Sequence, residues 1–541
     1  MLMARRYQGV LINSARKAMM SPITSALRFT PVYNASPAPQ SLDTRQTAAA
    51  ASTPGTQVIL GQDTRIPDSQ TYSSRGTLGN AQPRYVWEQD SIDKLSMHML
   101  GSIKGNSTAA RFQGLGTALM EQLVANGGQR VSQSALQVGE NSEIAPALLA
   151  LQQSRLREHA SNSITLNLTT ASGATVKLGL YNGEQGLAVD ADVQGGTLSA
   201  EELKGLATLA NGFQSAINGL TQETPSLQLG ALLKLDQTLF TGLQMNARLQ
   251  TSSGELQTFD LRMDGSTRNL KLQGPSGQIQ LDLDTQGGVV LGNQQQRQAA
   301  VSNYLSQFDA AQARGKGNAQ LMTLFKDAFS QLNSVDDSSP RPAGHEDTIN
   351  RYSRSLLSGL ADFDASISQT SQHLNSHRLD EEDRFSYQVS QATSNNGGGT
   401  SLDVKQHQQA KLDAAWHTEL SSSAKLDQVV DPNNYRYHML NEQASASTHV
   451  GFVNGALSEA SATQEASSTH RVMTYQNGEL KSDVSTPQSV RKSRDLMEML
   501  NQLLKQDEQA RRIGVQSNLD QQLAANSHLW LLQTDPSKIA D

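Results

Sequence analysis

Apolar and polar residues alternate with a period of two over three short runs between residues 161 and 193. The runs are SITLNLTT, TVKLGL and LAVDADV, in which every second residue is Ile, Leu, Val or Ala. This is the period of a strand with one buried face, because successive side chains point to opposite sides. Ser172-Gly173 and Asn182-Gly183 separate the runs, and such pairs favour tight hairpin turns. The pattern predicts a three-stranded antiparallel meander.

The period changes to that of a helix directly after this meander. Ser199 and Glu202 have the spacing of a capping box, in which each side chain accepts a backbone N–H at the start of a helix. A partner-binding coiled coil would also have apolar residues at spacings of three and four, but here the series ends before three heptads. This favours a helix that lies on the adjacent sheet. Its apolar positions are Leu203, Leu206, Ala210, Phe213, Ile217 and Leu220.

A shorter helix is expected around residues 228–237, and strand-like alternation then resumes as far as residue 283. Four further runs carry apolar residues at every second position, at 243–249, 259–263, 270–272 and 279–283. We therefore expect residues 161–285 to form an α+β unit, an antiparallel sheet with an inserted helix packed on its apolar face.

The segments on either side of this unit have helical spacing. In residues 85–160 we expect one helix with Ile92, Leu95 and Met99 on one face. A second should carry Phe112, Leu115, Leu119 and Leu123, and a third should lie in EIAPALLALQQSRLREHA (143–160). In residues 286–362 we expect helices between 294 and 334, then a loop, then a helix from about residue 348 that carries Ile349, Tyr352, Leu356 and Leu360.

Residues 363–485 alternate again, but polar residues dominate. Within this segment STHVGFVNGAL (447–457) and STHRVMTYQNGEL (468–480) repeat one pattern: Ser-Thr-His, an apolar stretch, Asn-Gly, any residue, Leu. Asn-Gly is favoured in two-residue hairpin loops because both positions need positive φ. The His-to-Asn spacing differs by two residues, which preserves the face of each side chain. We predict long antiparallel strands joined by these turns, the middle one over residues 456–476, in a sheet largely exposed on one face.

The two histidines of this repeat, His449 and His470, could alternatively bind a metal ion. A protein zinc site takes three or four ligands, and no third ligand stands at a recognisable spacing from this pair. We therefore assign the repeat to sheet architecture and predict no metal site.

The two ends of the chain differ in composition. Residues 1–84 contain a stretch rich in Pro, Ala, Ser, Thr and Gln, which predicts a disordered N-terminal arm. The first twenty residues are basic with a broken apolar run, unlike a secretory signal. They leave a transit peptide or translation from Met20 as alternatives. Residues 486–541 are expected to form a C-terminal helix and tail, with Thr486 as N-cap and Pro487 at the first helical position.

Composition narrows the class of protein. Of 541 residues, 37% are apolar and only 18% are charged, with a net charge of −7. No basic block is present, so a nucleic-acid partner is not expected. No stretch approaches the roughly 18 apolar residues of a membrane helix, so no transmembrane segment is expected. The sequence has no Cys, which excludes disulfides and thiolate catalysis and is compatible with export.

Reactive motifs are incomplete. QGLGTALM (113–120) has two glycines of a dinucleotide fingerprint but no preceding strand, and RGKGNAQ (314–320) lacks the Gly-Lys-Ser/Thr ending of a phosphate loop. HRLDEED (377–383) could be a cation site, but a solvated turn with local ion pairs is more typical. GHEDT (344–348) has the acids of a helix start. We identify no catalytic residue, and we expect no bound cofactor.

The chain resembles a group of uncharacterised proteobacterial proteins over about residues 84–510. The resemblance rests on RYVWEQDS (84–91), ARFQGLGTAL (110–119), SITLNLTTASGATVKL (163–178), GLTQETPSLQL (219–229), LMTLFKDAF (321–329) and FSYQVSQAT (385–393). Some members of the group are labelled lactate dehydrogenase. The sequence lacks the GxGxxG fingerprint that such an enzyme requires. We expect a non-enzymatic, exported or envelope-associated interaction protein with a protein or surface partner, with a soluble enzyme as the alternative.

Overall fold

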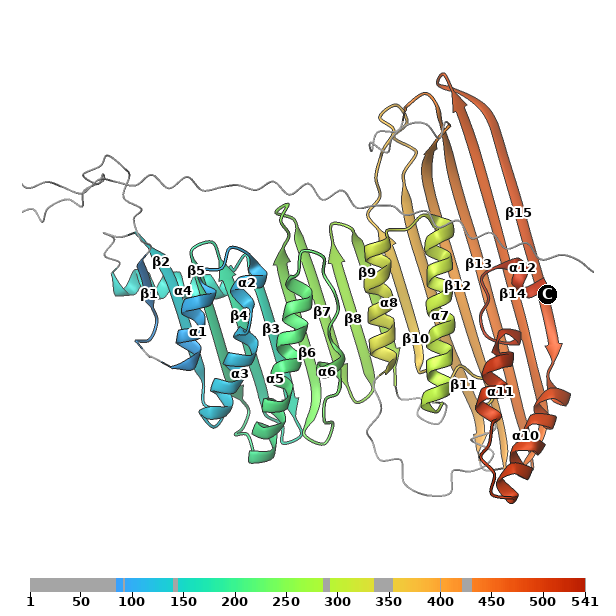
Figure 1. The fold of residues 1–541 in the computed structure, drawn as a ribbon, viewed down its shortest axis with the longest axis horizontal. Helices are drawn as coiled ribbons and strands as arrows, with labels where there is room; N and C mark the ends of the chain where they lie inside the picture. Colours follow the sequence, from blue (N-terminus) through green and yellow to red (C-terminus); the bar gives the residue numbers. More distant parts are fainter. Residues whose placement is uncertain are drawn as a thin grey trace, which may run out of the picture. The chain divides into compact units, whose positions relative to one another are not determined.

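The structure is a computed structural model that describes residues 84–90, 93–139, 145–285, 292–334, 354–398, 400–420 and 431–540. These residues build one antiparallel sheet of 15 strands, in the order β1-β2-β5-β4-β3-β6 and then β7 to β15 in sequence (Figure 1). The α+β fold class and the long C-terminal antiparallel sheet are thus confirmed. Of the predicted N-terminal arm, residues 1–83 lie outside the described residues.

The strands lengthen toward the C-terminal end of the sheet, where three of them have 19, 19 and 21 residues. The strands are β1 (Arg84–Trp87), β2 (Val131–Val138), β3 (Asn162–Thr170), β4 (Thr175–Gly183), β5 (Gly186–Gln194), β6 (Phe240–Gln250), β7 (Leu256–Asp264), β8 (Thr267–Gly274), β9 (Gly277–Asp284), β10 (Asp362–Gln369), β11 (Arg384–Gly398), β12 (Ser401–Glu419), β13 (Tyr435–Val453), β14 (Ala456–Gln476) and β15 (Glu479–Asp495).

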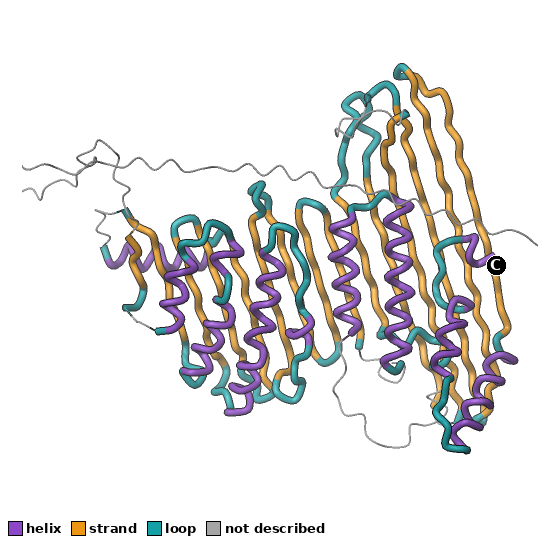
Figure 2. Tube along the Cα trace, in the orientation of Figure 1, coloured by secondary structure: helices purple, strands orange, loops and turns teal. Residues whose placement is uncertain are grey.

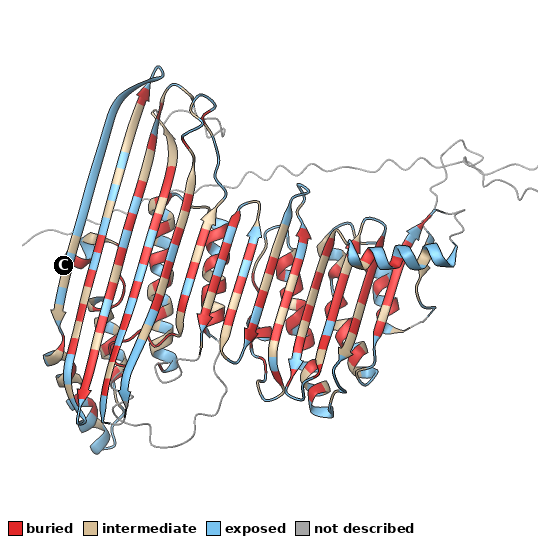
Figure 3. Cartoon of the chain, turned by 180° about the vertical axis from the view of Figure 1, so that it is seen from behind, coloured by how far each residue is buried: buried red, intermediate tan, exposed pale blue. Residues whose placement is uncertain are grey.

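Most helices pack on one side of this sheet, which we call the helix face (Figure 2). They are α1 (Lys94–Ser102), α2 (Thr108–Phe112), α3 (Leu115–Ala125), α5 (Ala200–Thr221), α6 (Gly230–Leu233), α7 (Gln294–Gly315), α8 (Ala319–Ser334), α10 (Met497–Arg512), α11 (Leu519–Asn526) and α12 (Pro536–Ala540), with a 3-10 turn, η1 (Ser527–Leu529). The opposite side, the open face, carries α4 (Pro146–Glu158) over its first strands (Figure 3).

The alternation of the strands sorts apolar side chains to the helix face. One continuous core runs along this face from Leu95 in α1 to Ala466 in β14. Helix α5 buries Phe213 and Ile217 in this core, next to Gly116 of α3, and its first turn has the predicted capping box between Ser199 and Glu202. The side chains on the other face are mostly polar and can stay hydrated. That face therefore needs no layer of helices and can stay open.

Residues 85–160 were predicted as helical, and the prediction is incomplete. Strands β1 and β2 of this segment pair with each other and extend the sheet. Their sequences are short or lack a regular period, so pairing determines their conformation: β2 pairs with β5, and β1 pairs with β2. The second predicted helix is broken at Gly114, whose φ of 72° ends the α2 segment and begins α3.

The turn predicted at Asn182-Gly183 is also misplaced, by two residues. Gly183 pairs with Gly186, so the loop is Glu184-Gln185. Asn182 is buried, and its side-chain oxygen accepts a hydrogen bond from Arg111 at 2.8 Å. This tertiary contact keeps the Asn-Gly pair inside the strand.

The predicted helices at residues 348 and 486 are not as expected. The first lies partly outside the described residues, but residues 354–360, which were to continue it, form turns. Thr486 and Pro487 lie within β15, and the helix α10 begins ten residues later at Met497. Because β15 is an edge strand, Pro487 can replace a residue there without breaking the interior of the sheet.

Both Asn-Gly turns and the strand between them are confirmed. Asn454, Gly455, Asn477 and Gly478 all have positive φ, between 49° and 82°. The middle strand β14 spans Ala456–Gln476, as predicted. Each hairpin also has one unpaired residue at the same place, three positions after the Gly: Ser458 and Lys481. The sequence repeat therefore encodes a repeated turn with a β-bulge.

Candidate functional site

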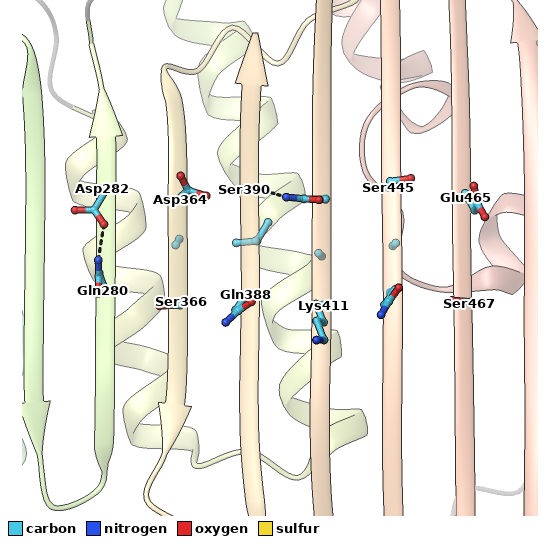
Figure 4. A pocket seen from close by; sticks show the side chains of 16 residues that line it. Gln280, Asp282, Asp364, Ser366, Gln388, Ser390, Lys411, Ser445, Glu465 and Ser467 are labelled. Carbon is cyan, nitrogen blue, oxygen red and sulfur yellow. Dashed lines mark hydrogen bonds between the residues drawn. The ribbon is translucent and has the colours of Figure 1, made fainter.

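The open face has a shallow groove over strands β9 to β14, with a volume of about 680 Å³. Two rows of polar side chains cross the strands here at consecutive open-face positions (Figure 4). One row contains Asp282, Asp364, Ser390, Gln409, Ser445 and Glu465. The other contains Gln280, Ser366, Gln388, Lys411, Gln443 and Ser467. At about 4.8 Å per strand, six strands give rows of about 24 Å.

The groove is acidic, and its polar side chains form only a few hydrogen bonds with one another. Gln280 donates to Asp282 at 2.7 Å, and Gln409 donates to the Ser390 hydroxyl at 2.9 Å. Asp282 and Asp364 are direct cross-strand partners, and like charges at such positions repel. Lys411 is the one cation that lines the groove in the described part of the chain, against three carboxylates. A bound cationic group would relieve this repulsion.

His449 and His470 do not form a site together. His449 lies on the open face, where its ring contacts the carboxylates of Asp403 and Glu459. His470 lies on the helix face, where its ring stacks on His438 with a centroid distance of 5.3 Å. The two turns stand at opposite ends of the sheet, so equivalent positions of the repeat occupy opposite faces. Within the described residues, no group of three or more acidic or His side chains is arranged to hold a metal ion.

The acidic run 377–383 is only in part the solvated turn that the sequence predicts, with His377 and Asp380 exposed. It belongs to a loop, residues 370–383, that joins β10 to β11 and folds over the open face at the ends of β12, β13 and β14. Glu381 is only 3% exposed. It accepts a hydrogen bond from the Tyr435 hydroxyl at 2.8 Å, and the Arg378 guanidinium lies 4.3 Å from the Tyr475 ring centre. We call this loop the clamp loop.

His417 connects the clamp loop to the sheet. Its side chain is fully buried, with Nδ1 2.5 Å from Asp383 and Nε2 3.1 Å from Glu381. Burial lowers the pKa of His417, but the hydrogen bonds and charges of these two acids outweigh burial and raise its pKa above the usual 6.5. Because both ring nitrogens face carboxylates, the imidazolium form fits the cluster. The arrangement holds the loop in place and has no free nitrogen for catalysis.

The incomplete motifs have structural roles. Gly114 and Gly116 of QGLGTALM lie at the junction of α2 and α3, where the Gly116 N–H donates to Gln214 at 2.8 Å. In RGKGNAQ, Gly315 and Gly317 lie against Phe385, and an added Cβ at either would stand 2.9 Å from that ring. GHEDT lies outside the described residues. His417 was not identified from the sequence. The signal that could have indicated this cluster is the set of tyrosines that surround it in space, Tyr435, Tyr437 and Tyr475.

No helix in the described ranges is long and apolar enough to span a membrane. The chain matches no protein-family model, and neither the curated proteins nor the solved structures include a significant match.

Proposed function

We propose that this chain is a non-enzymatic interaction protein, exported or associated with the cell envelope, that binds a protein partner through the open-face groove. The observation that carries the proposal is the groove itself: two rows of uncharged amides and hydroxyls, with three carboxylates and one lysine, across six strands. Such a mixture can donate and accept hydrogen bonds along its length. A partner surface with Lys or Arg and polar side chains complements it.

The size and chemistry of the groove support a non-obligate contact. Interfaces of this kind bury about 800 Å² on each partner and are about as polar as the rest of the surface. Rows of about 24 Å are of this scale. Aromatic anchors are absent from the residues that line the groove, so the affinity should depend on charge and therefore on salt. The Cys-free composition is compatible with an oxidising compartment.

The proposal can be tested by site-specific photo-crosslinking in the native cell. A benzophenone amino acid at Ser390 or Ser445, both in the groove, should give one discrete adduct with the same protein. The same label at Lys204, on the outer surface of α5, is the control and should not. Asp364→Lys should reduce the groove adduct, whereas Asp192→Lys, on the open face of β5 outside the groove, should leave it unchanged.

The opposite results would overturn the proposal. If groove positions give no adduct, or the same adducts as Lys204, the groove is not the contact surface. If Asp364→Lys leaves the adduct unchanged, charge complementarity is wrong. Immunoblotting of medium, envelope and cytosol tests the location separately, and a protein confined to the cytosol would contradict export.

A further inference from the structure

A second cavity lies on the helix face, beyond the end of α7, where the strands β12 to β15 continue past that helix (Figure 1). Its volume is about 460 Å³, within the range of small-molecule sites. The walls come from the end of α7, from four strands and from the tail before α12. It shares no lining residue with the open-face groove. We call it the Trp416 pocket.

Aromatic rings form one wall of this pocket. Trp416 from β12 and His438 from β13 are parallel within 1°, with centroids 5.0 Å apart. His470 from β14 completes the cluster, 5.7 Å from Trp416 and 5.3 Å from His438. Burial and neighbouring cationic groups lower the pKa of His438 to about 4, so this ring is neutral near pH 7. The wall is therefore a stack of three rings from three strands, of which Trp416 and His470 line the cavity.

The rest of the lining is polar but electrically balanced. Arg314 and Glu442 form a bidentate ion pair with N–O distances of 2.6 to 2.9 Å. Lys316 and Asp535 contribute one further charge of each sign. Within the described residues, no hydrogen bond engages the side chains of Thr486 and Gln488, which line the cavity from β15.

Lys316 has an unusual backbone conformation that relates to this pocket. It caps α7 with a φ of 57°, a left-handed conformation that favours glycine. Gly315 and Gly317 beside it pack on Phe385. The helix therefore ends directly on the sheet, and Lys316, between the two glycines, lines the cavity together with Ala313 and Arg314.

We propose that the Trp416 pocket binds a neutral oligosaccharide. The C–H face of a pyranose ring packs well on an indole ring such as that of Trp416, which is partly exposed and lines the cavity. Its hydroxyls both donate and accept hydrogen bonds, which suits Thr486, Gln488 and Ser468. An anionic ligand fits less well, because Glu442 and Asp535 balance the two cations. This proposal concerns a different face from the protein groove, and either can fail without the other.

Binding can be measured on the purified full chain by isothermal titration calorimetry. The probes are maltotriose, cellotriose and triacetylchitotriose, with trigalacturonate as the anionic comparison. At least one neutral probe should bind saturably, and Trp416→Ala should weaken it by about tenfold or more, as expected for an aromatic anchor. Trp416→Phe should retain most of the affinity, because it keeps an aromatic face. Asp192→Ala, on the open face of β5 and outside both cavities, is the control and should bind like the wild type.

A structural failure of Trp416→Ala would be detected by circular dichroism. Gln488→Ala then gives an independent reading, since this residue lies on the exposed edge strand, and it should also weaken binding. The proposal is overturned if no neutral probe binds saturably up to about 10 mM. It is also overturned if only trigalacturonate binds, or if a folded Trp416→Ala binds with the affinity of the wild type. If Trp416→Ala fails to fold, wild-type affinity of Gln488→Ala overturns it.

Discussion

Replacing His417 by Ala should release the clamp loop from the sheet. The imidazole is fully buried between Asp383 and Glu381, whose side chains are 17% and 5% exposed. Removing one partner of a buried ion pair destabilises a protein by about 3 to 5 kcal/mol, because it leaves an uncompensated buried charge. Asp383 is partly solvated, and Glu381 keeps its hydrogen bond from Tyr435. We therefore expect the lower limit, about 3 kcal/mol.

The loss should depend on pH in a defined direction. The folded-state pKa of His417 is raised above 6.5. Its contribution is therefore fully present below the unfolded pKa, and it is lost as the pH rises through the folded pKa. The wild type and the Ala variant should thus differ most near pH 6 and progressively less in alkaline solution.

Hydrogen exchange on residues 370–383 is the appropriate assay, because a chain of this length need not unfold in one step. The wild type and His417→Ala should be compared at several pH values, with denaturant midpoints as a global measure. A double-mutant cycle with Asp383→Asn isolates the pair. A loss under about 1 kcal/mol, the usual value for a surface ion pair, or a loss that does not change with pH, would refute the buried imidazolium.

Three further predictions concern the C-terminal strands and the absent dinucleotide motif. Gly455→Val or Gly478→Val should each destabilise the long hairpins by about 1 to 3 kcal/mol, since a β-branched residue is strained at positive φ. Hydrogen exchange should show faster opening of these hairpins and unchanged protection in residues 161–285. His449→Ala, which removes a partly exposed ion pair, should cost less than about 1 kcal/mol. Pro487→Thr should restore a backbone N–H to the edge strand β15 and increase self-association, measured by sedimentation velocity. Unchanged sedimentation would show that Pro487 does not limit pairing of this edge with another chain. Calorimetry with NADH should show no saturable binding, because no fingerprint follows a first strand; a micromolar dissociation constant would disprove this.

The candidate sites were less accessible to sequence reasoning than the fold. HRLDEED was noticed as an acidic run, but its partner His417 lies 34 residues beyond Asp383 and 36 beyond Glu381. No local pattern indicates that a loop will fold back over a strand end. In the same way, Trp416, His438 and His470 come together only through the register of three strands. The groove consists of residues that are individually ordinary surface positions.

The sequence by itself determined the elements that short-range interactions specify. Asn454-Gly455 and Asn477-Gly478 specify turns because these residues accept positive φ, and Ser199 with Glu202 starts α5 because each satisfies a backbone donor. Tertiary structure decided the backbone conformation wherever a long-range contact outweighed a local preference. Asn182 stays in a strand because Arg111 binds it, and Thr486 and Pro487 form strand rather than helix because β14 offers a partner along its length. Short-range rules fix a conformation only where no distant hydrogen-bond partner stabilises another one more strongly.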